Sequence, residues 1–94
     1  MKYVARSKQV AARMLGDEMV IMSAKDSTLF TLNPVATAIW NAADGTTTLE
    51  RIVEERVCGE FEVDRETAMA DALSFVGELA QHGIILISEQ PIPG

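Results

Sequence analysis

The sequence predicts an α+β fold in which three short strands come first, three helices follow and one strand ends the chain. The first third of the chain carries short apolar runs separated by polar turns, a pattern that is typical of strands. Later segments carry apolar residues at helical spacing, bounded by capping residues and glycines. The order β-β-β-α-α-α-β predicts a winged helix-turn-helix with an N-terminal three-stranded antiparallel sheet.

The three N-terminal strands are predicted from apolar runs between turn signals. Gln9–Leu15 alternates weakly and Met19–Met22 is a short apolar run beyond the Gly16-Asp17 turn, so together they predict a hairpin. Lys25–Ser27 is a second polar turn, and Thr28–Leu32 is predicted as the third strand. These segments form a meander.

The first helix is predicted from its own start and stop signals. Asn33 is a favoured N-cap, and Pro34 fits the first helical position because its missing N–H costs nothing there. Asp44-Gly45 is expected to end the helix, since glycine tolerates the left-handed conformation found there. The apolar stripe of this helix consists of Val35, Ile39 and Trp40.

The second helix is predicted to begin with a capping box, in which Thr47 and Glu50 each satisfy a free N–H group of the other. Gly59 is expected to end it. One apolar face recurs at helical spacing and should pack on the core. That face consists of Leu49, Ile52, Val53 and Val57.

The third helix is the longest, with Asp64 as its cap, an end near His82 and Gly83 as its stop. Ile84–Ile87 follows as the last strand. Two adjacent apolar stripes widen the buried face of this helix. One consists of Ala68, Ala72, Phe75 and Leu79, and the other of Met69, Leu73, Val76 and Ala80.

Length and composition predict a single domain over residues 1–94, with residues 1–8 and 89–94 as loose tails. No apolar run approaches the ~20 residues that a membrane-spanning helix needs, and we expect no membrane partner. One cysteine and no signal-peptide pattern fit a cytoplasmic protein. The net charge of −6 argues against a nucleic-acid partner, which requires basic side chains.

The sequence contains no convincing catalytic set, so we expect no enzyme activity, no cofactor and no metal site. His82 is the only histidine, and its position in the last helical turn is explained by the helix dipole. Cys58 has no cysteine or histidine near it in the sequence and is interpreted as a half-buried structural thiol. The many carboxylates alternate with arginines and are typical of a solvated surface.

A binding role is predicted from the third strand, whose outer edge is expected to be open. An open edge can accept an extended peptide as an additional strand, and the second stripe of the long helix could supply an apolar wall. The same stripe could instead simply cover the sheet. The candidate peptide-binding residues are Thr28, Leu29, Phe30, Thr31, Leu32, Met69, Leu73, Val76 and Ala80.

Two runs of this chain resemble the PqqD-like family, which consists of peptide chaperones also called RiPP precursor recognition elements. They are LNPVATAIWNAADGTTTLERIVEE and FEVDRETAMADALSFVGELAQHGIILI. The resemblance implies a three-stranded sheet joined to a winged-helix bundle. It also implies that the leader segment of a ribosomally made precursor peptide adds to the third strand and is presented to a modifying enzyme, such as a radical SAM protein.

The pathway stays open at this point, because the stretch before Leu32-Asn33 departs from the Tyr-Pro-Glu-Gly-like segment of the quinone-pathway members. A role in pyrroloquinoline quinone biosynthesis and a role in a lasso-peptide or radical SAM system both fit. Two other function classes are compatible with the predicted fold, a winged-helix DNA-binding regulator and a structural dimerisation module. The first is disfavoured by the acidic third helix. The second would exchange the short N-terminal strands between protomers, so the chain could be a monomer or a strand-swapped dimer.

Overall fold

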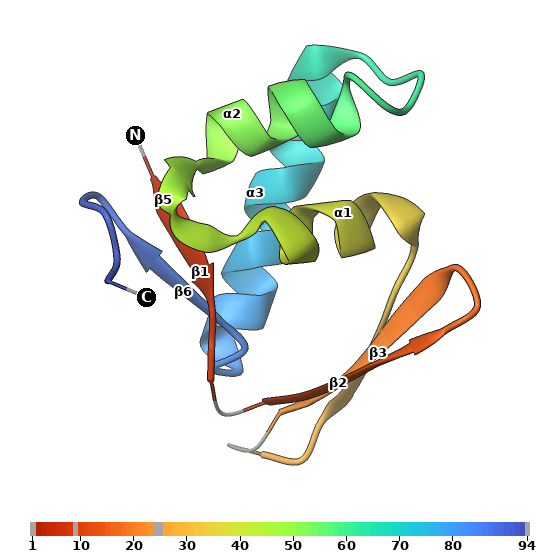
Figure 1. Cartoon of the computed structure of the whole chain (residues 1–94), viewed down its shortest axis with the longest axis vertical. Coiled ribbons are helices and arrows are strands. Elements are labelled where there is room, and N and C mark those ends of the chain that lie inside the picture. Colours follow the sequence, from red (N-terminus) through yellow and green to blue (C-terminus); the bar gives the residue numbers. More distant parts are fainter. Residues whose placement is uncertain (1, 9, 24–25, 94) are drawn as a thin grey trace.

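The computed structural model describes residues 2–8, 10–23 and 26–93. It confirms the α+β class: a three-stranded antiparallel sheet precedes the helices, and a further strand follows them (Figure 1). A second small sheet lies on the other side of the helices. The elements in chain order are β1 (Tyr3–Arg6), β2 (Val10–Leu15), β3 (Glu18–Ser23), β4 (Leu29–Leu32), α1 (Pro34–Ala42), β5 (Asp44–Thr48), α2 (Leu49–Ile52), η1 (Val53–Val57), α3 (Arg65–Gln81) and β6 (Ile85–Ser88).

The predicted meander is present, with the strand order β2-β3-β4. Leu15 pairs with Glu18 across a two-residue loop, and Gly16 takes the positive φ of 66° that such a tight turn needs. Met19 and Ile21 of β3 point into the core, whereas the side chains of β2 are mostly exposed. The meander is therefore half-covered, with one face on the helices.

Residues 3–6 are not part of a loose tail, contrary to the prediction for residues 1–8. Tyr3–Arg6 forms β1, the central strand of a second sheet with the order β5-β1-β6, and Val4 is fully buried. The C-terminal segment is also fixed, because the Ile92 N–H donates to the Gly45 carbonyl at 2.8 Å. Such short segments carry no periodic signal, and their partners are distant in sequence.

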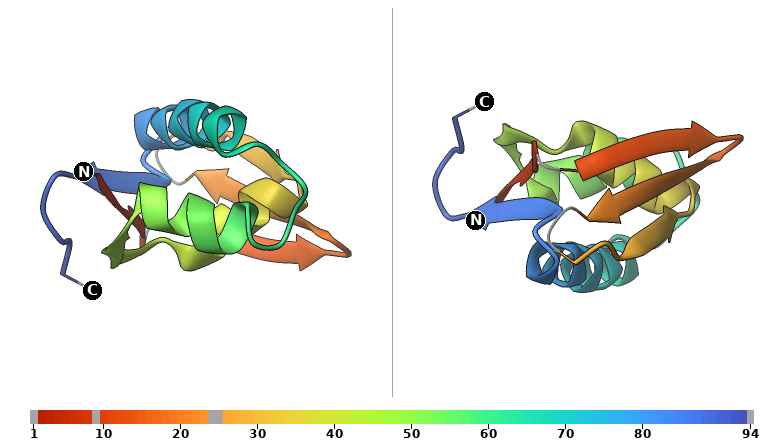
Figure 2. Two further views of the ribbon diagram at one scale, coloured as in Figure 1. Left: turned by 90° about the horizontal axis from the view of Figure 1, so that it is seen from above. Right: turned by 90° about the horizontal axis from the view of Figure 1, so that it is seen from below.

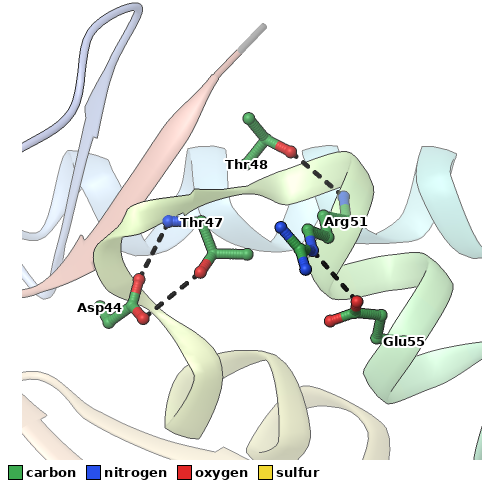
Figure 3. A network of polar contacts seen from close by, with 5 residues as sticks. All are labelled: Asp44, Thr47, Thr48, Arg51 and Glu55. Atoms are coloured by element: carbon green, nitrogen blue, oxygen red, sulfur yellow. Dashed lines mark hydrogen bonds and ion pairs between the residues drawn. The ribbon is translucent and has the colours of Figure 1, made fainter.

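Helix α1 begins as predicted, with Asn33 Oδ1 accepting from the Ala36 N–H at 2.8 Å. It ends earlier than predicted, at Ala42, and Asp44 and Gly45 belong to β5. Asp44 Oδ1 instead accepts from the Thr46 N–H at 2.9 Å and from the Thr47 N–H at 3.0 Å. The bond to Thr47 is shown in Figure 3. The hydrogen bond from the Thr46 N–H lowers the pKa of the Asp44 carboxyl.

The cap of the second helix lies one residue later than the predicted Thr47. Thr48 Oγ1 accepts from the Arg51 N–H at 3.3 Å, while the Thr47 hydroxyl donates to Asp44 Oδ2 (Figure 3). Beyond α2 the chain widens into the π-helical turn η1, closed by the Cys58 N–H on the Val53 carbonyl. The predicted apolar face is confirmed: Leu49, Ile52, Val53 and Val57 are all buried.

Helix α3 begins at the predicted cap, where Asp64 Oδ2 accepts from the Thr67 N–H at 3.2 Å. It ends at Gln81, followed by Gly83 at a φ of 72°. Its buried face packs on α1, η1 and β6 and consists of Ala68, Ala72, Val76 and Leu79. Within the described residues, no helix is long and apolar enough to cross a membrane.

Candidate functional site: the open edge of β4 beside α3

Strand β4 has one unpaired edge among the described residues, because it pairs only with β3. The Ser23 N–H donates to the Thr28 carbonyl at 2.9 Å, so these two residues form a hydrogen-bonded pair. Bonded and non-bonded pairs alternate in an antiparallel ladder, so Phe30 and Leu32 also turn their backbone groups toward β3. Leu29 and Thr31 therefore direct their N–H and C=O groups to the open edge.

The two ends of the predicted strand are already occupied. The Thr28 N–H donates to Asp26 Oδ1 at 3.1 Å, and the Leu32 carbonyl accepts from the Thr37 hydroxyl at 3.2 Å. These bonds hold the two ends of the strand in place. Of the five residues predicted to bind peptide on this strand, Leu29 and Thr31 are the ones with outward-facing backbone groups.

Helix α3 runs alongside the β4 side of this sheet, whereas β2 lies on the far side (Figure 2). At one end of the strand the Phe30 ring meets the His82 ring edge-on, with the ring centroids 4.9 Å apart. At the other end Asn33 and Val35 face the first half of α3 across a pocket. The open edge therefore has a helix wall along its length.

A polar contact fastens the β3–β4 turn to the end of α3. His82 Nδ1 lies 2.5 Å from Asp26 Oδ2, and the Ser23 hydroxyl donates to the His82 carbonyl at 2.6 Å. The hydrogen bond to His82, followed by those to Thr28, holds the pKa of the Asp26 carboxyl well below its ordinary value. This contact joins residues 56 positions apart, and no sequence pattern signals it.

The pocket between α1 and α3 has a volume of about 340 Å³ and a mostly apolar wall. Asn33, which directly follows β4, places one side of this pocket at the end of the open edge. Helix α3 contributes one flank to the pocket, along which Thr67, Asp71 and Phe75 follow one another at intervals of one helical turn. The lining consists of Asn33, Val35, Ala36, Ile39, Val57, Val63, Thr67, Ala68, Asp71, Ala72 and Phe75.

The stripe that the sequence predicted as the helix wall lies elsewhere. Val76 is 1% exposed and belongs to the core, so it is not available as a wall residue. Leu73 is exposed, and Met69 and Ala80 are half-buried. None of these residues lines the pocket. By helical spacing they lie on one side of the buried face, while Asp71 and Phe75 lie on the other.

The sequence could not choose between the two flanks of α3, because both carry apolar residues. Phe75 falls in the predicted packing stripe, and Asp71 counts in the sequence only as one of the acidic residues of the third helix. The choice depends on which flank β4 approaches, and that is a tertiary contact.

The described residues contain no group of three or more His, Cys, Asp or Glu side chains arranged to hold a metal ion. The open edge of β4 instead has the features of a binding surface, because the outward backbone groups of Leu29 and Thr31 lie beside the apolar pocket between α1 and α3.

Comparison with known proteins defines the class. The chain resembles the solved structure of TbiB1 in complex with the TbiA(β) leader peptide, with a TM-score of 0.74 and 30% identity, covering 86% of this chain and 93% of TbiB1. It also shares the fold of a lasso peptide synthetase B1 complexed with the leader peptide, with a TM-score of 0.73, 19% identity, and coverage of 88% of this chain and 96% of that protein. No curated protein matches the chain significantly.

The family follows from the sequence itself. The sequence model of coenzyme PQQ synthesis protein D (PqqD) matches residues 18–85, which is most of the chain. This chain belongs to the PqqD family. The resemblance inferred from the two sequence runs is thereby confirmed.

Proposed function

We propose that this protein binds the leader segment of a ribosomally made precursor peptide and presents it to a modifying enzyme. The observation that carries the proposal is the open edge of β4, with the outward backbone groups of Leu29 and Thr31 beside α3. An extended peptide can pair with these groups as a fourth strand. Both solved relatives are described as complexes with leader peptides, which supports the assignment.

Affinity and selectivity come from different parts of the site in this proposal. Backbone hydrogen bonds to β4 supply affinity for extended chain of any sequence, and side-chain pockets select among sequences. We favour the flank of α3 that carries Asp71 and Phe75 as the helix wall, because these residues line the same pocket as Asn33 at the end of β4. The contacts predicted from the sequence, with Met69, Leu73 and Ala80, would instead place the peptide on the opposite flank of α3. The NMR titration described below distinguishes the two placements.

The proposed role is that of an accessory protein, which holds and delivers a substrate and performs no chemistry of its own. Its partner would be a peptide-modifying enzyme such as a radical SAM protein. Precursor peptides of this class are made by ribosomes, so the proposed role places the protein in the cytoplasm. The choice between pyrroloquinoline quinone and another modified peptide depends on which precursor it binds.

The test is an NMR titration of the ¹⁵N-labelled protein with the synthetic leader segment of a precursor peptide encoded beside its gene. We expect the largest amide shifts at Leu29 and Thr31 of β4 and at Asp71 and Phe75 of α3. Shifts around Met69 and Leu73 with none at Phe75 would move the helix wall back to the sequence-predicted stripe. Shifts confined to residues outside both β4 and α3 would overturn the proposed site.

A further inference from the structure

The pocket beside β4 contains a single charged residue, Asp71, in an otherwise apolar and neutral lining. Among the described residues no ion pair involves Asp71, although three ion pairs form elsewhere. Its carboxylate is exposed and lies one turn from Phe75, at the rim of an apolar wall. Any peptide that packs an apolar side chain into the pocket must therefore pass an uncompensated negative charge.

A second carboxylate, that of Glu78, lies on the same flank of α3. Residues 71, 75, 78 and 82 follow helical spacing on one side of α3, so Glu78 lies on the same flank as Asp71. His82 ends the flank and already contacts Asp26. No Lys or Arg lines the pocket in the part of the chain that the structure describes. The ionised carboxylates of this flank are thus negative, and the chain as a whole carries a net charge of −6.

A basic side chain is the natural complement of this charge, and an acidic one would be repelled. Its position follows from geometry. One helical turn from Asp71 to Phe75 spans roughly 6 Å, and two residues of an added strand span roughly 6.8 Å and return to the same face. A peptide residue that contacts Phe75 and a residue two positions away can thus face the apolar wall and Asp71 together.

We propose that the pocket and Asp71 select peptides in which an apolar residue is accompanied, two positions away, by Lys or Arg. This inference rests on the proposed peptide-binding function and adds its sequence preference. Asp71 acts here as a specificity residue. The β4 edge supplies the affinity that is common to all extended peptides.

The test is selection from a random twelve-residue peptide library displayed on phage, with the wild-type protein and with D71N and D71K. Wild-type protein should enrich Lys or Arg two positions from an apolar residue. D71N should lose that enrichment, and D71K should enrich Glu or Asp at the same position. E66Q, an exposed change outside the Asp71 flank of α3, should select as the wild type does.

Affinity measurements on one selected peptide give the magnitude. Replacing its basic residue with Glu should weaken binding to the wild type several-fold, on the order of three- to tenfold for an exposed ion pair plus a like-charge contact. The loss should shrink at high salt and disappear in D71N. Equal binding of the Lys and Glu peptides, with both still shifting the Leu29 and Thr31 amides, would overturn the charge preference and leave the proposed function standing. If no selected peptide shifts these amides, the proposed function fails and this inference fails with it.

Discussion

At the scale of single residues, Gly45 shows how β5 accommodates the segment around Ile92. Its φ is 84°, and a Cβ built there would lie 2.4 Å from the Ile92 carbonyl oxygen. The predicted left-handed conformation of Gly45 is confirmed, but its predicted role as a helix stop is wrong, because Gly45 belongs to β5. In the structure it lets the C-terminal segment approach the backbone of β5, so it is required for two reasons at once.

Substituting Gly45 should therefore destabilise the protein. G45A introduces a left-handed alanine and a backbone clash, and we expect a loss of about 1–3 kcal/mol in the free energy of unfolding. Urea denaturation measures it. G77A is the matched control, because nothing lies within 4 Å of a Cβ at this site inside α3. It should stabilise the protein by roughly 0.5–1 kcal/mol, and equal stability of G45A and wild type would contradict the assignment.

A second prediction concerns the contact between Asp26 and His82. Because the folded-state pKa of Asp26 is depressed, its contribution to stability is present above the unfolded value of 3.8 and is lost as the pH falls through the lower folded pKa. Wild-type protein should thus exceed D26N in stability near pH 6, with the difference shrinking below pH 3.8. Thermal unfolding across this pH range measures it.

The control for this pH dependence is D17N, which removes a carboxylate from the exposed β2–β3 turn. It should not reproduce the effect of D26N. A stability difference between wild type and D26N that is constant from pH 6 to pH 2 would show that the carboxylate gains nothing from His82.

At the scale of elements, the β2-β3-β4 sheet has two unpaired edges among the described residues, and only that of β4 lies beside α3. Proline at Thr31 removes an outward N–H without touching the β3–β4 ladder, as an edge strand permits. T31P should weaken leader-peptide binding about tenfold, since it removes one backbone hydrogen bond and hinders the approach of the strand. Fluorescence anisotropy with a labelled leader peptide measures the change.

The matched control for T31P lies on the opposite edge of the same sheet. Ladder alternation turns the N–H of Ala12 in β2 outward, just as it does that of Thr31 in β4. A12P should therefore leave peptide binding unchanged while causing a similar loss of stability. A larger effect of A12P than of T31P would place the peptide on β2.

The helix starts illustrate how far sequence rules reach at this scale. Asn33 and Asp64 are caps as predicted, because the side-chain oxygen of each accepts from a backbone N–H of the first helical turn. The cap of the second helix, predicted at Thr47, is wrong by one residue, since Asp44 binds Thr47 from the preceding turn. The local sequence pattern thus predicts the presence of α2, whereas the first residue of α2 depends on the competing hydrogen bonds between Asp44 and Thr47.

At the scale of the whole molecule, the β5-β1-β6 sheet joins the two ends of the chain to the middle. Tyr3 pairs with Thr48 on one side and with Ser88 on the other. These pairings span so much of the chain that no local pattern could predict them. The fold class and the helix faces were predictable from periodicity, whereas this sheet and the choice of α3 flank were not.

The buried N-terminal strand yields a prediction at this scale. Val4 is fully buried, so V4A should cost roughly 2 kcal/mol of unfolding free energy, from two lost methyl groups and the cavity left behind. V63A, at a residue that is 41% exposed, should cost far less. Chemical denaturation compares the two. A V4A protein as stable as V63A would mean that the N-terminal residues are loose, as the sequence first suggested.

The central claim is that a peptide adds to the open edge of β4, and amide hydrogen exchange measures this most directly. In the free protein the Leu29 and Thr31 amides should exchange quickly, because they face solvent, while the Phe30 amide, turned to β3, is protected. Saturation with the leader peptide should protect Leu29 and Thr31 strongly and leave Ala12 of β2 unchanged. Bound peptide with unchanged exchange at Leu29 and Thr31, or with new protection at Ala12 alone, would contradict the account.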